Sequence, residues 1–177
     1  MSSTLIPLAL AAAMFPGLIF APDVEHDKTT VPSFDLSSYL GTWYEIARYG
    51  HRFERGMDNV TAEYLLRDDG KVDVINSGWR NGKMKTAHGK AKQPDPSGEP
   101  ARLRVSFFMF FYSDYRVLMI DEDYSVALVG SSSPRYLWIL SRPPELDGAV
   151  LDKVLAEACR RGYDTAKLIY VDQSLNR

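Results

Sequence analysis

The sequence has little cysteine and little excess charge. Cys159 is the single cysteine among 177 residues, which excludes an intrachain disulfide framework and a metal site built from several thiolates. The helical periodicity around Cys159 favours a small core residue over a reactive thiol. Lys and Arg number 21 against 23 Asp and Glu, a net charge of -2, so no whole-molecule attraction to nucleic acid is expected. Recognition through charge must use a local patch.

A long hydrophobic run is also lacking. Residues 4–21 are nearly devoid of polar groups, but Pro7 and Pro16 interrupt them, and a membrane-spanning helix needs about 20 apolar residues. This pattern is typical of an export signal. We therefore expect residues 1–30 to be a signal segment with its polar linker and residues 31–177 to form one domain.

From residue 34 onward the chain consists of short strand-like segments separated by turn signals. Two of the turns, at Asp68–Gly70 and Asn81–Gly82, are of hairpin type. No crossover helix separates the eight segments, so we predict an all-β fold, an eight-stranded up-and-down antiparallel barrel without open edges. An amphipathic helix within 143–164 is expected to cover its outside, followed by a short strand within 165–173. The eight expected strands span 42–50, 60–67, 71–79, 84–92, 101–108, 115–121, 125–131 and 135–142.

The alternation of apolar and polar residues indicates which side chains face the barrel interior. It selects Tyr64, Asn76 and Phe107, together with the small residues Gly89 and Ala91. An eight-stranded barrel can hold one small ligand or be filled by its own side chains. Small residues on one strand and aromatic residues elsewhere favour an apolar ligand pocket with few polar groups. A filled barrel is the alternative.

The topology also assigns the connections to two ends of the barrel. One end collects aromatic side chains and cations, among them Arg52 and Arg55, whereas the other end is acidic. An apolar cavity with a cationic rim suits a ligand that has a long tail and an anionic head. The alternative is that these loop charges are merely solvated.

Catalytic motifs are scarce. Gly130–Pro134 contains serines without the Gly-x-Ser-x-Gly elbow of hydrolases. His51 and His88 have no metal-ligand spacing, and no cofactor motif is present. Glu45 is expected inside the barrel, either as a structural hydrogen-bond partner or as a base with a raised pKa. We therefore expect a binding protein without metal or cofactor.

Three motifs in order resemble the signature of the lipocalins. Gly41, Thr42 and Trp43 match the opening Gly-x-Trp motif, "SDYRVLMIDEDY" resembles the second block, and "WILSR" resembles the third. The resemblance implies that Arg142 lies against Trp43 and closes the barrel floor by a cation–π contact.

The segments "LGTWYEIARYGHRFERG" and "YLWILSRPP" are closer still to the bacterial lipocalins of outer-membrane lipoprotein type, and are similar to apolipoprotein D. The resemblance covers roughly residues 34–173. It implies a carrier of fatty acids or lysophospholipids for membrane maintenance, located in the periplasm or at the periplasmic face of the outer membrane. It implies these ligand contacts: Tyr64, Asn76, Phe107 and Trp138, with Tyr136, Tyr112 and Phe110 as further candidates.

One departure from this group concerns membrane attachment. Its bacterial members carry a lipidated cysteine directly after the signal, and "LIFAPD" has none. A lipid anchor is therefore not supported. Two other functions stay open: an enzyme of lipocalin-like fold, of isomerase type, and a barrel that serves mainly as a membrane or partner-interaction module. The aromatic run 107–112 is expected to contact a membrane surface or a second copy in a homodimer.

Overall fold

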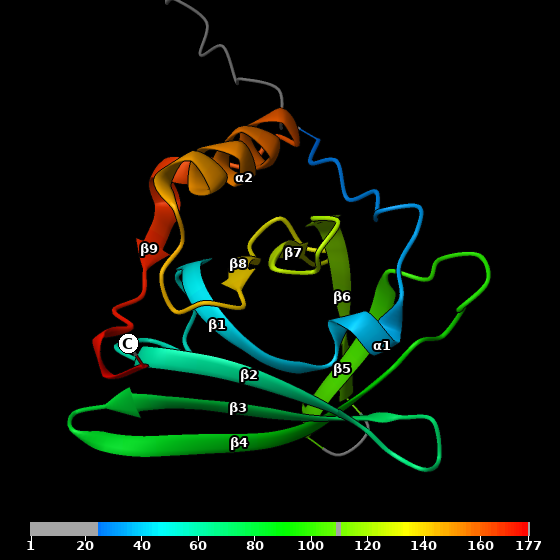
Figure 1. Ribbon diagram of the computed structural model, residues 1–177, viewed down its shortest axis with the longest axis horizontal. Coiled ribbons are helices and arrows are strands. Elements are labelled where there is room, and N and C mark those ends of the chain that lie inside the picture. The colour runs from blue at the N-terminus through cyan, green and yellow to red at the C-terminus, as the bar shows by residue number, and fades with distance from the viewer. Residues whose placement is uncertain (1–24, 109–110, 177) are drawn as a thin grey trace, which may run out of the picture.

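The computed structural model describes residues 25–108 and 111–176, and in these ranges antiparallel strands close into a barrel. The strand order is β2-β3-β4-β5-β6-β7-β8-β1-β9, and a further pairing joins β1 to β2. Figure 1 shows the resulting barrel, with β9 and α2 outside it. The predicted eight-stranded antiparallel barrel is confirmed. The elements are α1 (Leu36–Tyr39), β1 (Gly41–Tyr49), β2 (Asp58–Leu66), β3 (Val72–Arg80), β4 (Lys83–Lys92), β5 (Arg102–Phe108), β6 (Phe111–Ile120), β7 (Val126–Gly130), β8 (Leu137–Ser141), α2 (Gly148–Arg160) and β9 (Leu168–Tyr170).

The turn between β3 and β4 shows how local sequence sets the register. Asn81 and Gly82 have φ values of 52° and 70°, the left-handed backbone that a type I′ hairpin turn requires at both central positions. The turn pairs Arg80 with Lys83, and β3 then pairs with β4 along its whole length. Because the side-chain period of a strand is two, this register fixes which residues face inward.

Strand β1 has different partners along its two halves. Its first residues, Gly41–Tyr44, pair with β2, whereas Ala47–Tyr49 pair with β9 on the same edge. Strand β8 pairs with the other edge of β1. Strand β9 therefore pairs with the part of the β1 edge that β2 does not use, and it lies outside the barrel.

Helix α2 covers the outer faces of β1, β7 and β8. Its buried residues Val154 and Ala158 pack with Leu128 and Ile139 of the strands in a second apolar core. Figure 1 shows the helix lying across this side of the barrel. The helix thus accounts for the burial of β7 and β8 on both faces, and the predicted helix outside the barrel is confirmed. None of the helices in the described residues is long and apolar enough to cross a membrane.

The expectation that Cys159 is a core residue was wrong. Its side chain is exposed, and its sulfur lies 3.5 Å from the Thr165 hydroxyl. The buried stripe of α2 runs through Val154 and Ala158, and a residue directly after Ala158 points away from that stripe because successive helical residues are about 100° apart.

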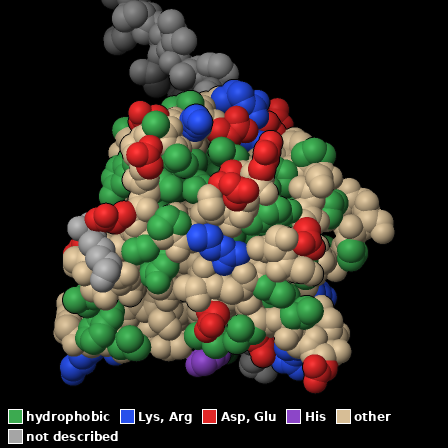
Figure 2. Space-filling view, viewed as in Figure 1, with side chains coloured by type: hydrophobic (Ala, Val, Ile, Leu, Met, Phe, Trp, Pro, Cys, Tyr) green, Lys and Arg blue, Asp and Glu red, His purple; other side chains and the backbone are tan. Residues whose placement is uncertain are grey.

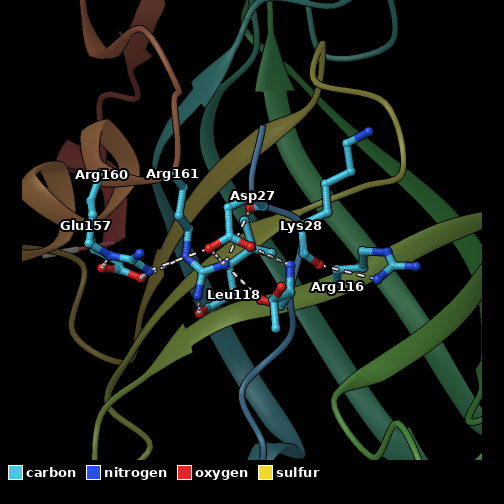
Figure 3. Close-up of polar contacts among 8 residues, drawn as sticks. Asp27, Lys28, Arg116, Leu118, Glu157, Arg160 and Arg161 are labelled. Carbon is cyan, nitrogen blue, oxygen red and sulfur yellow. Dashed lines mark hydrogen bonds and ion pairs between the residues drawn. The ribbon is translucent and has the colours of Figure 1, made fainter. Parts of the chain in front are cut away.

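Residues 25–31, which the sequence assigns largely to a linker, pack against the barrel wall. Arg161, 7% exposed, donates to the carbonyls of Asp27, Thr29 and Leu118 and pairs with Glu157. Figure 3 shows Arg161 at the centre of these contacts, between α2 and the N-terminal segment. This contact could not be predicted from the segment, whose charged composition is that of a linker. The groups that bind each other are backbone carbonyls and one arginine distant in sequence, Arg161.

Candidate ligand-binding site

The floor of the barrel is built by α1 and the start of β1. Trp43 is fully buried, and its indole N–H donates to the Tyr39 carbonyl at 2.8 Å. The Arg142 guanidinium carbon lies 3.9 Å from the centroid of the Trp43 ring, so the contact implied by the resemblance is present. Arg142 also donates to four backbone carbonyls, those of Ser38, Leu40, Thr42 and Tyr124. These contacts tie α1 to the sheet and close this end.

Above the floor, three tyrosine hydroxyls form a chain inside an otherwise apolar wall. The Tyr115 hydroxyl lies 2.6 Å from that of Tyr39 and 3.0 Å from that of Tyr64. Burial raises the pKa of Tyr64 to about 12, so all three hydroxyls stay protonated at neutral pH. The surrounding wall is aliphatic and is formed by Val72, Val74, Ala91, Leu103, Val105, Val117, Ala127, Val129 and Leu140.

A bulge in β1 turns a second polar side chain inward. The register of β1 against β8 shifts between Glu45 and Ala47, so that Ile46 and Ala47 both face the outer core under α2. An extra residue of this kind reverses the alternation beyond it. Arg48 therefore shares the inner side with Glu45. Simple alternation placed Glu45 inside but missed Arg48.

Glu45 and Arg48 belong to a buried cluster that also includes His51 and Glu54 of the β1–β2 connection. Arg48 donates to a Glu45 carboxylate oxygen and to the carbonyls of Glu54 and Met57. His51 Nε2 lies 2.7 Å from Glu54 Oε2, and the Glu54 carboxylate is 3.8 Å from Arg48 Nε. The side chains of Arg48 and Glu45 are 4% and 6% exposed. The guanidinium is thus occupied by the protein's own acceptors.

The two carboxyl groups of the cluster differ in proton affinity. Burial and the negative charge of Glu54 raise the pKa of Glu45 to about 8, although Arg48 opposes the shift. Burial also acts to raise the pKa of Glu54, but hydrogen bonds from His51 and Trp138 and the charge of Arg48 outweigh it and lower that pKa. At neutral pH Glu45 is therefore the carboxyl group that keeps its proton and Glu54 is the one that is ionised. This arrangement suits a structural role for Glu45.

Aromatic side chains surround this cluster. The indole N–H of Trp138 donates to Glu54 at 3.3 Å, and Tyr136 stacks on Trp138 with ring centroids 5.8 Å apart. His51 packs against both rings. Of the residues proposed for ligand contact, Trp138 and Tyr136 therefore lie at this cluster, and Tyr64 lies in the chain of tyrosine hydroxyls. Their neighbours Arg48, His51, Glu54 and Tyr115 were not assigned from the sequence motifs.

The remaining candidates fall in different places. Asn76 pairs with Ala62 on the inner side, and its Oδ1 is enclosed without a partner among the described residues. Phe107 is 44% exposed beside Gly89. Tyr112 lies on the outer wall under Lys90 and Lys92, because it is three residues from the inward Tyr115, an odd separation that reverses its face. Phe110 lies outside the described residues.

The open end carries the two expected arginines. Arg52 and Arg55 are exposed, and Arg52 lies over the Phe53 ring at 4.8 Å. Arg80 donates to the Phe53 carbonyl and holds this connection near the β3–β4 turn. Figure 2 shows that charges of both signs are interspersed with hydrophobic side chains on the face drawn, with acidic groups gathered in its upper part. No patch of one sign dominates that face.

Comparison with known proteins agrees with this architecture. A family profile described as a lipocalin-like domain matches residues 34–173. Outer membrane lipoprotein Blc of Escherichia coli K12 is 47% identical over 176 residues, which cover 96% of this chain and 97% of that protein. Apolipoprotein D of Rattus norvegicus is 34% identical over 151 residues, which cover 80% of this chain and 78% of that protein.

A solved structure shares the same barrel. Insecticyanin of the tobacco hornworm Manduca sexta superimposes with a TM-score of 0.70 at 28% sequence identity, covering 82% of this chain and 84% of its own. The floor is closed by Trp43 and Arg142, the inner wall is aliphatic, and the family profile spans the barrel. The chain therefore belongs to the lipocalin family.

Proposed function

We propose that this protein binds the hydrocarbon chain of a fatty acid or a lysophospholipid inside the barrel and serves membrane maintenance in the bacterial cell envelope. The observation that carries the proposal is the closed barrel whose inner wall is aliphatic between the Trp43 floor and the polar cluster near the mouth. Similarity to an outer membrane lipoprotein supports the envelope location.

The distribution of charge supports one orientation of the ligand. Arg48 is a cation on the inner side, and its donors already go to Glu45, Glu54 and Met57. An anionic head placed there would have to displace these buried partners, which costs desolvation and lost hydrogen bonds. A head placed beside the exposed Arg52 and Arg55 displaces no buried partner and so does not have this cost. The tail therefore lies inside and the head lies at the rim.

Ligand binding is tested directly by native mass spectrometry of protein purified without added lipid, followed by titration with oleate. Arg55→Glu is expected to weaken oleate binding by about threefold at low salt, because an exposed charge contributes little and is screened. Lys153→Glu is the matched control, since it makes the same charge change on the exposed face of α2. Absence of binding by the wild-type protein to any fatty acid or lysophospholipid would refute the proposed function.

Delivery to a membrane is supported by exposed aromatic side chains near the mouth. Phe108 and Phe111 are 67% and 76% exposed and stack on each other. Flotation with anionic liposomes tests this contact. Phe111→Ser should reduce flotation, whereas sedimentation that shows a concentration-dependent dimer lost in the same variant would favour a homodimer surface. Mass spectrometry of the mature N-terminus after export tests whether the signal segment is removed and whether a lipid is attached.

A further inference from the structure

The seam between β4 and β5 is shorter than the strands that form it. Strand β4 pairs with β3 along all nine residues of β3, but within the described residues it pairs with β5 only at Lys90, Ala91 and Lys92. The stretch from Lys83 to His88 is exposed throughout. Figure 1 shows β5 leaving β4 near one end of that long strand. The barrel wall therefore separates at this seam on the side of the mouth.

Phe107 lies where the two strands part. Gly89 pairs with the buried Val74 and so faces inward. A Cβ at Gly89 would lie 2.8 Å from Cδ1 of the Phe107 ring, closer than real side chains approach. The absence of a side chain at position 89 thus lets the Phe107 ring lie across the gap. The ring is nevertheless 44% exposed.

A hollow of about 280 Å³ opens at the same point. Its walls are formed by Arg67, Asp73, His88, Gly89, Lys90, Ser106, Phe107 and Phe108. Two aromatic rings therefore lie beside two cations, Arg67 and Lys90, and one carboxylate, Asp73. This apolar hollow with a net positive wall matches an amphiphile with an apolar chain and a negative head.

We propose that the β4–β5 seam is a side entrance through which the chain of an anionic amphiphile reaches the barrel interior, and that Phe107 is its gate. The proposal rests on the proposed lipid-binding function and specifies the route. Moving the ring aside opens the gap without breaking ladder hydrogen bonds between described residues, because the two strands are no longer paired there. A gate of this kind changes the rates of entry and exit more than the affinity.

The test is stopped-flow fluorescence with cis-parinaric acid. Phe107→Ala should raise the association rate and the dissociation rate, each by about fivefold or more. Phe107→Trp should slow both rates. Phe53→Ala, which removes an exposed ring from the β1–β2 connection at the open end, is the matched control and should leave both rates unchanged. Thermal unfolding of each variant checks that the fold is kept.

Three results would overturn the gate and leave the proposed function standing. Phe107→Ala could weaken binding with no increase in association rate, which would make Phe107 a wall residue only. Alternatively, Phe53→Ala could speed exchange while the Phe107 variants do not, which would place entry at the open end. If the wild-type protein binds neither cis-parinaric acid nor oleate, the proposed function fails and the entrance fails with it. Normal binding with unaltered rates in the Phe107 variants refutes the entrance alone.

Discussion

The two ends of the barrel hold their arginines in opposite ways. At the floor, Arg142 donates to four backbone carbonyls and lies over the Trp43 ring, and it forms no ion pair with a carboxylate of the described residues. Near the mouth, Arg48 is enclosed with Glu45 and Glu54. We therefore expect the floor to be insensitive to pH between about pH 5 and pH 8, whereas the mouth contains titratable groups next to the aromatic side chains proposed to meet the ligand.

Removing the indole at the floor should have the largest effect. Trp43 is fully buried and packs on Tyr39 with ring centroids 4.8 Å apart, so Trp43→Ala should lower the free energy of unfolding by about 3–5 kcal/mol. Urea unfolding followed by far-UV circular dichroism measures this loss. Trp79→Ala, at a partly exposed site on the β3–β4 hairpin, is the control and should lose much less. Equal losses in the two variants would contradict a specific role of the floor.

Much of this floor could be predicted from sequence, and the mouth could not. Trp43 and Arg142 lie in short contiguous motifs, and the hairpin turns fix the strands between them. The inward position of Arg48 could not be predicted because one bulge in β1 reverses the alternation beyond it. The sequence of a single strand gives no reliable sign of a bulge. His51 and Glu54 come from a loop, and both side chains contact Trp138, which is distant from them in the sequence, while Glu54 also lies beside Arg48.

A smaller effect is expected from the arginine at the floor. Arg142→Met keeps the aliphatic length but leaves carbonyls of α1 and β1 without their charged donor, so we expect a loss of about 1.5–3 kcal/mol in unfolding free energy. Arg142→Lys should restore only part of this, because an ammonium cannot reproduce the planar fork of donors. Full rescue by lysine would mean that charge alone, and not the geometry of the fork, closes the floor.

The effect that separates the two ends most clearly is the pH dependence of stability at the mouth. The pKa of Glu45 is raised to about 8 from an ordinary value of 4.5. Between these values the folded chain keeps a proton that the unfolded chain has released. Glu45 therefore costs stability progressively as pH rises through this window, and the cost is complete above about pH 8. The groups around it are Arg48, Glu54, His51 and Tyr64. The lowered pKa of Glu54 acts in the opposite sense and at lower pH, where stability is lost as the carboxylate is protonated.

Glu45→Gln should flatten the decline of unfolding free energy between about pH 5 and pH 8, because glutamine has no proton to lose. Urea midpoints at a series of pH values measure the slope. Glu63→Gln, on the outer side of β2 opposite Thr42, is the matched control and should keep the wild-type slope. Arg142→Met should also keep that slope, since the floor contains no comparable carboxyl group among the described residues. A wild-type slope in Glu45→Gln would show that its proton is not held by the fold, and the contrast between a pH-insensitive floor and a titrating mouth would then be lost.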